Sequence, residues 1–240
     1  MRVKHKRIIG ITALLMLLST VLFCAIIYMM ERPGGLSDRR MSRALGQKVT
    51  LHIPLGKTPD KAVERFRGPS SMEVIHREPV KGGILLFMRR YNQTDSSNLQ
   101  VEYVRKTWMG WKWVWGGGFG ISESLQSKSS LNYMSMPKLD HISTPFPMVF
   151  GDILNPSIKN VTVKSQNNGT YQAKLATVGN EKMIWFVFLP SAISTPFDIE
   201  GFTEEGNLIA RKTITDPRDS GSVNLENDLK LSETQCLPTN

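Results

Sequence analysis

A mostly hydrophobic run without a charged side chain extends from Ile8 to Met30 near the N-terminus. A helix of these 23 residues is about 34 Å long, which is enough to cross a hydrocarbon layer of about 30 Å. The apolar part of a cleaved signal peptide is shorter and ends at a pair of small residues, which this run lacks. The pattern therefore predicts an uncleaved signal anchor over 8–30, with a cleaved signal peptide as the alternative.

After the anchor, the pattern predicts a linker and then a first folded module. Residues 31–57 are polar, basic and rich in Gly and Pro, and are expected to form a linker. Thr58, Pro59 and Asp60 are typical of a helix N-terminus. The segments that follow alternate between apolar and polar residues and are separated by Gly-containing turns, as in hairpins; these are 72–77, 84–91, 99–108 and 111–115. Residues 58–121 are therefore predicted to form a helix packed on an antiparallel meander.

The C-terminal half predicts a second module made of strands. Residues 122–150 are rich in Ser and Pro and are expected to connect the two modules. Five strand-like segments are predicted within 151–215, at 158–163, 171–177, 183–189, 197–202 and 208–213. Residues 184–189 are apolar on both faces, which is typical of a central strand covered on both sides. The polar residues 216–240 are expected to form a disordered tail.

Taken together, these patterns predict an α+β, mainly β fold class. The chain is expected to contain an N-terminal transmembrane helix, a helix-plus-antiparallel-meander module and a small β-sandwich-like module.

The distribution of charge predicts the orientation and the partners. Arg2, Lys4, Lys6 and Arg7 precede the anchor, so residues 1–7 are expected to form a cytoplasmic tail and the rest to lie outside the cell membrane. Residues 31–110 hold 15 basic and 8 acidic side chains, whereas 111–240 hold 11 and 13. A basic membrane-proximal region favours anionic lipid or an anionic wall polymer; a solvated linker is the alternative. Another membrane protein is a further possible partner, and nucleic acid is not expected outside the cell.

Four of the five tryptophans lie close together, and three of them alternate along one predicted strand. Trp111, Trp113 and Trp115 are expected to point to one face, with Lys112 and Val114 on the other. A row of exposed indoles could bind a small ligand or a wall glycan by stacking. Large aromatic residues more often pack in the core, and we favour packing against the helix that begins at Pro59.

No convincing catalytic, metal or cofactor site is predicted. Ser122 lies in a Gly-x-Ser-x-Ser sequence, which lacks the second glycine of a nucleophile elbow. Ser135 and Lys138 have Ser-x-x-Lys spacing, but Pro137 disfavours the helix that would bring them together. His52, His76 and His141 are not spaced as metal ligands. The sequence therefore favours a protein that is not an enzyme and that needs no cofactor.

Three segments together resemble a known group of proteins. They are 58–64 (TPDKAVE), 103–118 (YVRKTWMGWKWVWGGG) and 184–189 (IWFVFL), followed by Gly206. They are similar to small, uncharacterised, membrane-anchored extracytoplasmic proteins of spore-forming Gram-positive bacteria, the bacilli. The resemblance covers roughly residues 55–215. It implies a compartment and an architecture, and it implies no activity.

The favoured function is a non-catalytic, single-pass interaction or sensor module at the cell surface. The alternative is a binder of small ligands or wall glycans that uses the Trp-rich strand. A hydrolase with an unrecognised site is less favoured, because the nucleophile, base and metal signals are all weak.

Overall fold

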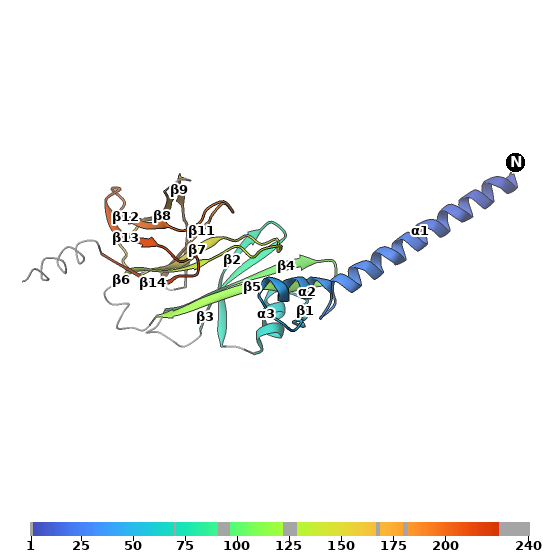
Figure 1. The fold of residues 1–240 in the computed structure, drawn as a ribbon, viewed down its shortest axis with the longest axis horizontal. Coiled ribbons are helices and arrows are strands. Elements are labelled where there is room, and N and C mark those ends of the chain that lie inside the picture. Colours follow the sequence, from blue (N-terminus) through green and yellow to red (C-terminus); the bar gives the residue numbers. More distant parts are fainter. Residues whose placement is uncertain are drawn as a thin grey trace, which may run out of the picture.

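The computed structural model describes residues 2–69, 71–90, 97–121, 129–166, 169–179 and 182–225. One long helix, α1 (Arg2–Glu31), projects from a body of antiparallel strands (Figure 1). The N-terminal helix is long and apolar enough to span a membrane, and the rest of the protein does not cover its apolar segment. The predicted fold class, α+β and mainly β, is confirmed, because one long apolar N-terminal helix is followed by a body of antiparallel strands.

A second helix, α2 (Leu36–Ala44), lies where the sequence pattern predicts a linker. The chain turns sharply between α1 and α2, and Gly34 adopts a left-handed conformation with φ of +75°. A Cβ on Gly35 would lie 2.6 Å from the carbonyl oxygen of Met29, so only glycine fits there. The helix buries Asp38, Met41 and Ser42. Two of these three buried residues are polar. The sequence of α2 therefore lacks the apolar face by which a helix is usually predicted.

The first sheet contains five antiparallel strands in the order β1-β5-β4-β3-β2. They are β1 (Leu55–Gly56), β2 (Met72–Val80), β3 (Gly83–Arg90), β4 (Ser97–Thr107) and β5 (Gly110–Ile121). The helix α3 (Pro59–Arg67) packs against this sheet and buries Ala62 and Val63. The Thr58 hydroxyl caps the helix by accepting a hydrogen bond from the backbone N of Lys61 at 3.2 Å. The predicted helix and meander are both present.

Two further sheets form the C-terminal part of the body. One has the order β10-β11-β7-β6-β14 and the other the order β13-β12-β8-β9, with antiparallel pairing throughout. The first comprises β6 (Ser129–Met136), β7 (Met148–Ile153), β10 (Lys174–Val178), β11 (Lys182–Phe188) and β14 (Ser220–Asn224). The second comprises β8 (Asn160–Ser165), β9 (Gly169–Gln172), β12 (Phe197–Phe202) and β13 (Leu208–Ile214).

The sheet that contains β11 has a core on each of its faces. Trp185 and Val187 pack in a cluster with residues of β8, β12 and β13, whereas Ile184 and Phe186 pack in a cluster with residues of the first sheet. The Phe186 ring lies 4.9 Å from that of Phe87 on β3. The body therefore has three layers of sheet, and the prediction that 184–189 is a central, covered strand is confirmed.

Two segments expected to lack regular structure contain strands. β6 and part of β7 lie within the expected connector 122–150, and β14 lies within the expected tail 216–240. β6 buries Ser130, Asn132 and Ser135 beside its apolar residues, so its sequence resembles a polar loop. β14 contributes one buried apolar side chain, Val223, and is held by its pairing with β6. The rest of the predicted tail, 226–240, and residues 122–128 lie outside the described residues.

Candidate functional site

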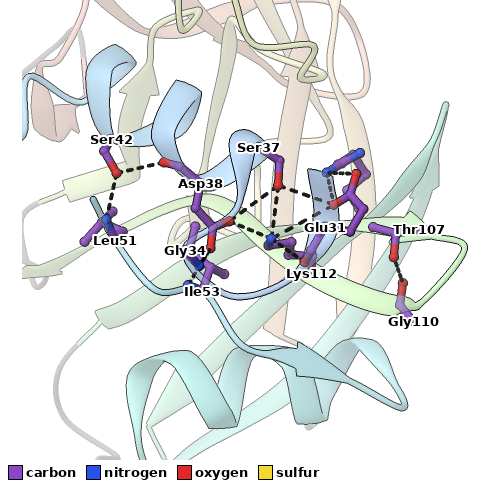
Figure 2. Close-up of polar contacts among 11 residues, drawn as sticks. Glu31, Gly34, Ser37, Asp38, Ser42, Leu51, Ile53, Thr107, Gly110 and Lys112 are labelled. Atoms are coloured by element: carbon purple, nitrogen blue, oxygen red, sulfur yellow. Dashed lines mark hydrogen bonds and ion pairs between the residues drawn. The ribbon is translucent and has the colours of Figure 1, made fainter. Parts of the chain in front are cut away.

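A group of charged side chains joins the end of α1 to the first sheet. It consists of Glu31, Asp38, Arg105 and Lys112, and we call it the juxtamembrane cluster (Figure 2). Lys112 lies on β5 and is only 2% exposed. A lysine is almost never buried so deeply without partners of opposite charge. The cluster is therefore the place where buried charge links the apolar helix to the β-sheet body.

The ammonium group of Lys112 has a hydrogen-bond acceptor for each of its three protons. Its Nζ lies 2.6 Å from Oδ1 of Asp38, 2.8 Å from the carbonyl oxygen of Glu31 and 3.0 Å from Oγ of Ser37. The Glu31 carboxylate lies 4.0 Å away and adds a second negative charge. Because Lys112 bonds the last residue of α1 and two residues of α2, one side chain holds both helices against β5 (Figure 2).

Asp38 extends the cluster into the loop that follows α2. Its Oδ2 accepts hydrogen bonds from the backbone N of Gly34 at 2.7 Å and of Ile53 at 2.9 Å. One turn later, the Ser42 hydroxyl donates to the Asp38 carbonyl and accepts from the backbone N of Leu51 (Figure 2). A carboxylate that accepts two backbone N–H bonds and an ammonium bond is well satisfied even when fully buried. These bonds fix the loop between α2 and β1.

Arg105 neutralises the second carboxylate of the cluster. One of its terminal nitrogens, Nη2, contacts both oxygens of Glu31, at 2.8 and 3.1 Å. Arg105 lies opposite Lys112 in the pairing of β4 with β5, so both cations come from neighbouring positions on the same face of the sheet. The cluster therefore contains two carboxylates and two cations. Its net charge is zero, as expected for a buried group of ions.

A small cavity of about 170 Å³ adjoins the cluster, and residues from α1, α2, β4, β5 and the 141–143 segment line it. Ser37 and Lys112 lie beside it at the spacing of a Ser–Lys catalytic pair. In such a pair the amine must be free to take the proton of the hydroxyl. Here all three protons of the ammonium are engaged and two carboxylates stabilise its charge. The geometry therefore fits a structural connection better than a nucleophilic site.

The three tryptophans of β5 do not share one face of the sheet. The register shifts by one residue between Tyr103 and Val104, so Val114 is an extra residue and β5 has a bulge. Val104 pairs with Trp113 and Tyr103 pairs with Trp115, which places these two indoles on opposite faces. The expectation of a single row of three indoles is corrected by this bulge.

The environments of the three indoles also differ. Trp113 is 4% exposed and stacks on Phe66 of α3 with the ring centroids 4.0 Å apart. Trp111 and Trp115 are half-buried and pack against the same core, and Lys106 lies over the Trp111 ring. Packing against α3 is thus observed for Trp113. Ligand binding by these residues stays a prediction.

Another buried carboxylate, that of Glu102, lies on β4 next to the Trp-rich strand β5. It accepts hydrogen bonds from Nε1 of Trp113 and from Gln100, and Arg67 of α3 donates to both of its oxygens at 3.0 and 3.3 Å. Burial raises the pKa of the Glu102 carboxyl, although Arg67 and the hydrogen bonds oppose that shift. A Cβ at Gly116 would lie 1.7 Å from Oε2 of Glu102. The first glycine of the 116–118 run therefore makes room for this carboxylate.

Neither buried charged group was predicted from the sequence. The signal was present at Lys112, because a basic residue between two tryptophans on a strand must face away from the indoles into some second environment. The positions of its partners could not be predicted, since Glu31, Ser37 and Asp38 lie more than seventy residues away along the chain.

A comparison with known proteins found no family model that matches the chain, and neither a characterised protein nor a solved structure that is similar to it.

Proposed function

We propose that this chain is a single-pass, membrane-anchored protein that presents a β-rich interaction or sensor module outside the cell membrane. The observation that carries the proposal is the juxtamembrane cluster. It joins the last residue of a helix of membrane-spanning length to the sheet through buried ion pairs. A flexible tether would need no such connection. The cluster supports a module held at a fixed height and orientation above the membrane.

The charge distribution supports the orientation in this proposal. Four basic residues precede the apolar run, whereas Glu31 and Arg32 follow it with opposite charges. Basic residues are retained on the cytoplasmic side, so the β-rich body lies on the other side.

The surface of α2 supports an anionic partner near the membrane. Arg39, Arg40 and Arg43 are all exposed, while Asp38 and Ser42 on the same helix are buried. Each base close to a negatively charged surface contributes about 1 kcal/mol of attraction. Because the juxtamembrane cluster holds α2 directly after α1, these arginines would lie at the level of anionic lipid headgroups or wall polymers.

The experiment that tests this proposal is protease treatment of intact cells combined with crosslinking. We expect an external protease to remove the body and to leave a short membrane-bound fragment that contains α1. Protection of the body in intact cells, with digestion only after lysis, would reverse the orientation and refute the proposal.

Crosslinking in intact cells then tests the role of the rigid connection. If the module binds a neighbouring membrane protein at a fixed height, Lys112→Met should reduce the yield of the crosslinked product. The matched control is Lys174→Met, which removes an exposed ion pair with Glu78 far from α1 in the sequence. Equal yields from both variants would show that the connection does not serve partner binding.

A further inference from the structure

The turn between β4 and β5 carries two large apolar side chains into solvent. Trp108 is 84% exposed and Met109 is 39% exposed. An indole is large and apolar, so an exposed one at a hairpin tip calls for a partner. The tip also has a fixed shape. The Thr107 hydroxyl donates to the carbonyl of Gly110 at 2.9 Å (Figure 2). It also accepts from the backbone N of Met109 at 3.1 Å.

The tip lies beside the apolar part of α1. The Trp108 ring contacts the Phe23 ring edge-on, with the centroids 6.0 Å apart. Phe23 precedes Glu31 by eight residues, which corresponds to about 12 Å along a helix axis. Charged residues first follow the apolar run at Glu31 and Arg32. The tip of the β4–β5 hairpin therefore lies beside the apolar part of α1 and not beside its charged C-terminal end.

The juxtamembrane cluster holds the hairpin in this position. Arg105 and Lys112 lie close to the turn, on the two strands that lead into and out of it, and both bond Glu31 at the end of α1. The tip cannot leave the side of α1 without breaking these bonds. Trp108 is thus fixed relative to the apolar helix from both ends of the hairpin turn.

We propose that Trp108 and Met109 insert into the leaflet from which α1 emerges, at the boundary between headgroups and acyl chains. This inference rests on the proposed function, because it requires α1 to span the membrane. Tryptophan prefers this boundary, where its apolar ring and polar N–H are both satisfied. Lys106, exposed next to the tip, is placed to meet anionic headgroups. The hairpin thus provides a second attachment to the bilayer and prevents the body from tilting about α1.

The test uses spin labels on the full chain in vesicles of phosphatidylcholine and phosphatidylglycerol. Cys24 and Cys236 are replaced by serine, and a label is attached at Met109→Cys. Leu17→Cys is the reference inside the bilayer, and Glu205→Cys, on the exposed β12–β13 turn, is the reference in water. We expect the accessibility of position 109 to oxygen, relative to a water-soluble nickel complex, to exceed that of position 205 several-fold and to stay below that of position 17.

The outcomes separate this inference from the proposed function. A water-like result at position 17 would show that α1 does not span the bilayer and would refute both. A lipid-like result at position 17 with a water-like result at 109 would refute only the insertion of the hairpin. Strong dipolar broadening between labels at 109, without access to oxygen, would identify a second copy of the chain as the occupant and also overturn the inference.

A second measurement does not depend on a label. Quenching of the native tryptophan fluorescence by brominated lipid should be strong in the unlabelled protein. It should lose most of its amplitude in Trp108→Phe, because the described part of the chain places the remaining indoles in the body. Equal quenching of both proteins would contradict the insertion of Trp108.

Discussion

Replacing Lys112 by methionine removes the central cation of the juxtamembrane cluster while keeping most of the volume of the side chain. Asp38, which is fully buried, would then keep its two backbone N–H donors and lose its ion pair with Lys112, at 2.6 Å. Glu31 would keep Arg105. The main effect is therefore an uncompensated buried carboxylate at Asp38.

The expected loss of stability is large because both Lys112 and Asp38 are buried. Removing one partner of a buried ion pair typically costs about 3–5 kcal/mol, and we expect a loss of this size for Lys112→Met. The same substitution at Lys174 breaks an ion pair of similar length, 2.7 Å, whose lysine side chain is 62% exposed. Exposed pairs contribute about 0–1 kcal/mol, so Lys174→Met is the matched control.

The assay is urea unfolding of the full chain in nanodiscs, followed by hydrogen exchange at single amides. The amides of Gly34 and Ile53 donate to Asp38, so their protection reports the cluster even if it opens before the body unfolds. The double variant Asp38→Asn/Lys112→Met removes the uncompensated charge. Its loss of stability should be smaller than the sum of the two single losses by at least about 1 kcal/mol.

Two results would refute this reasoning. The first is a loss for Lys112→Met no larger than that for Lys174→Met, with the Gly34 and Ile53 amides still protected. The second is strict additivity in the double variant, which would show that Lys112 and Asp38 do not stabilise each other.

Two further predictions concern the tryptophans of β5 and the buried Glu102 of β4. Trp113→Ala should lower the free energy of unfolding by about 3–5 kcal/mol, because a buried indole stacked on Phe66 is lost; losses at the half-buried Trp111 and Trp115 should be smaller, and unchanged melting of all three variants would favour a binding platform. Glu102→Gln should change how stability depends on pH. Because burial raises the folded-state pKa of Glu102 above 4.5, its protonated form adds stability below that pH, and this is lost as the pH rises through the folded pKa. The stability of the unsubstituted protein relative to Glu102→Gln should therefore fall as the pH rises from below 4.5 through the raised folded-state pKa of Glu102. A difference that does not change with pH would contradict the prediction.

Local patterns were sufficient to predict most elements of the fold. Thr58 and Pro59 predicted the start of α3 because a capping hydroxyl and a proline at the first turn act within a few residues. Residues 184–189, which include Trp185, are apolar at every position. A strand with one face in solvent would be polar at every second position, so this run predicted a strand covered on both faces. In both cases the information lies in neighbouring residues.

Features that depend on distant residues could not be predicted. Asp38 and Ser42 look like solvent-exposed positions of a linker, and they are buried only because β5 supplies Lys112 and the loop after α2 supplies its backbone N–H groups. The bulge at Val114 inserts one residue into β5 and moves Trp115 to the opposite face of the sheet. The order of apolar and polar residues in β5 does not indicate where this bulge lies. The candidate site combines both kinds of feature, so its geometry required the structure.

The two-faced sheet has a consequence for the order in which the chain folds as it is synthesised. All five strands of the first sheet are synthesised by Ile121, but Phe87 of this sheet packs against Phe150 of β7 and Phe186 of β11, which follow later in the chain. The chain then crosses repeatedly between the two remaining sheets and returns to β6 only with β14. Contacts between residues so far apart form slowly, and the uncovered apolar surface is prone to aggregation meanwhile. Folding of this protein therefore includes a delay during which a foldase or a holding chaperone would be of most use.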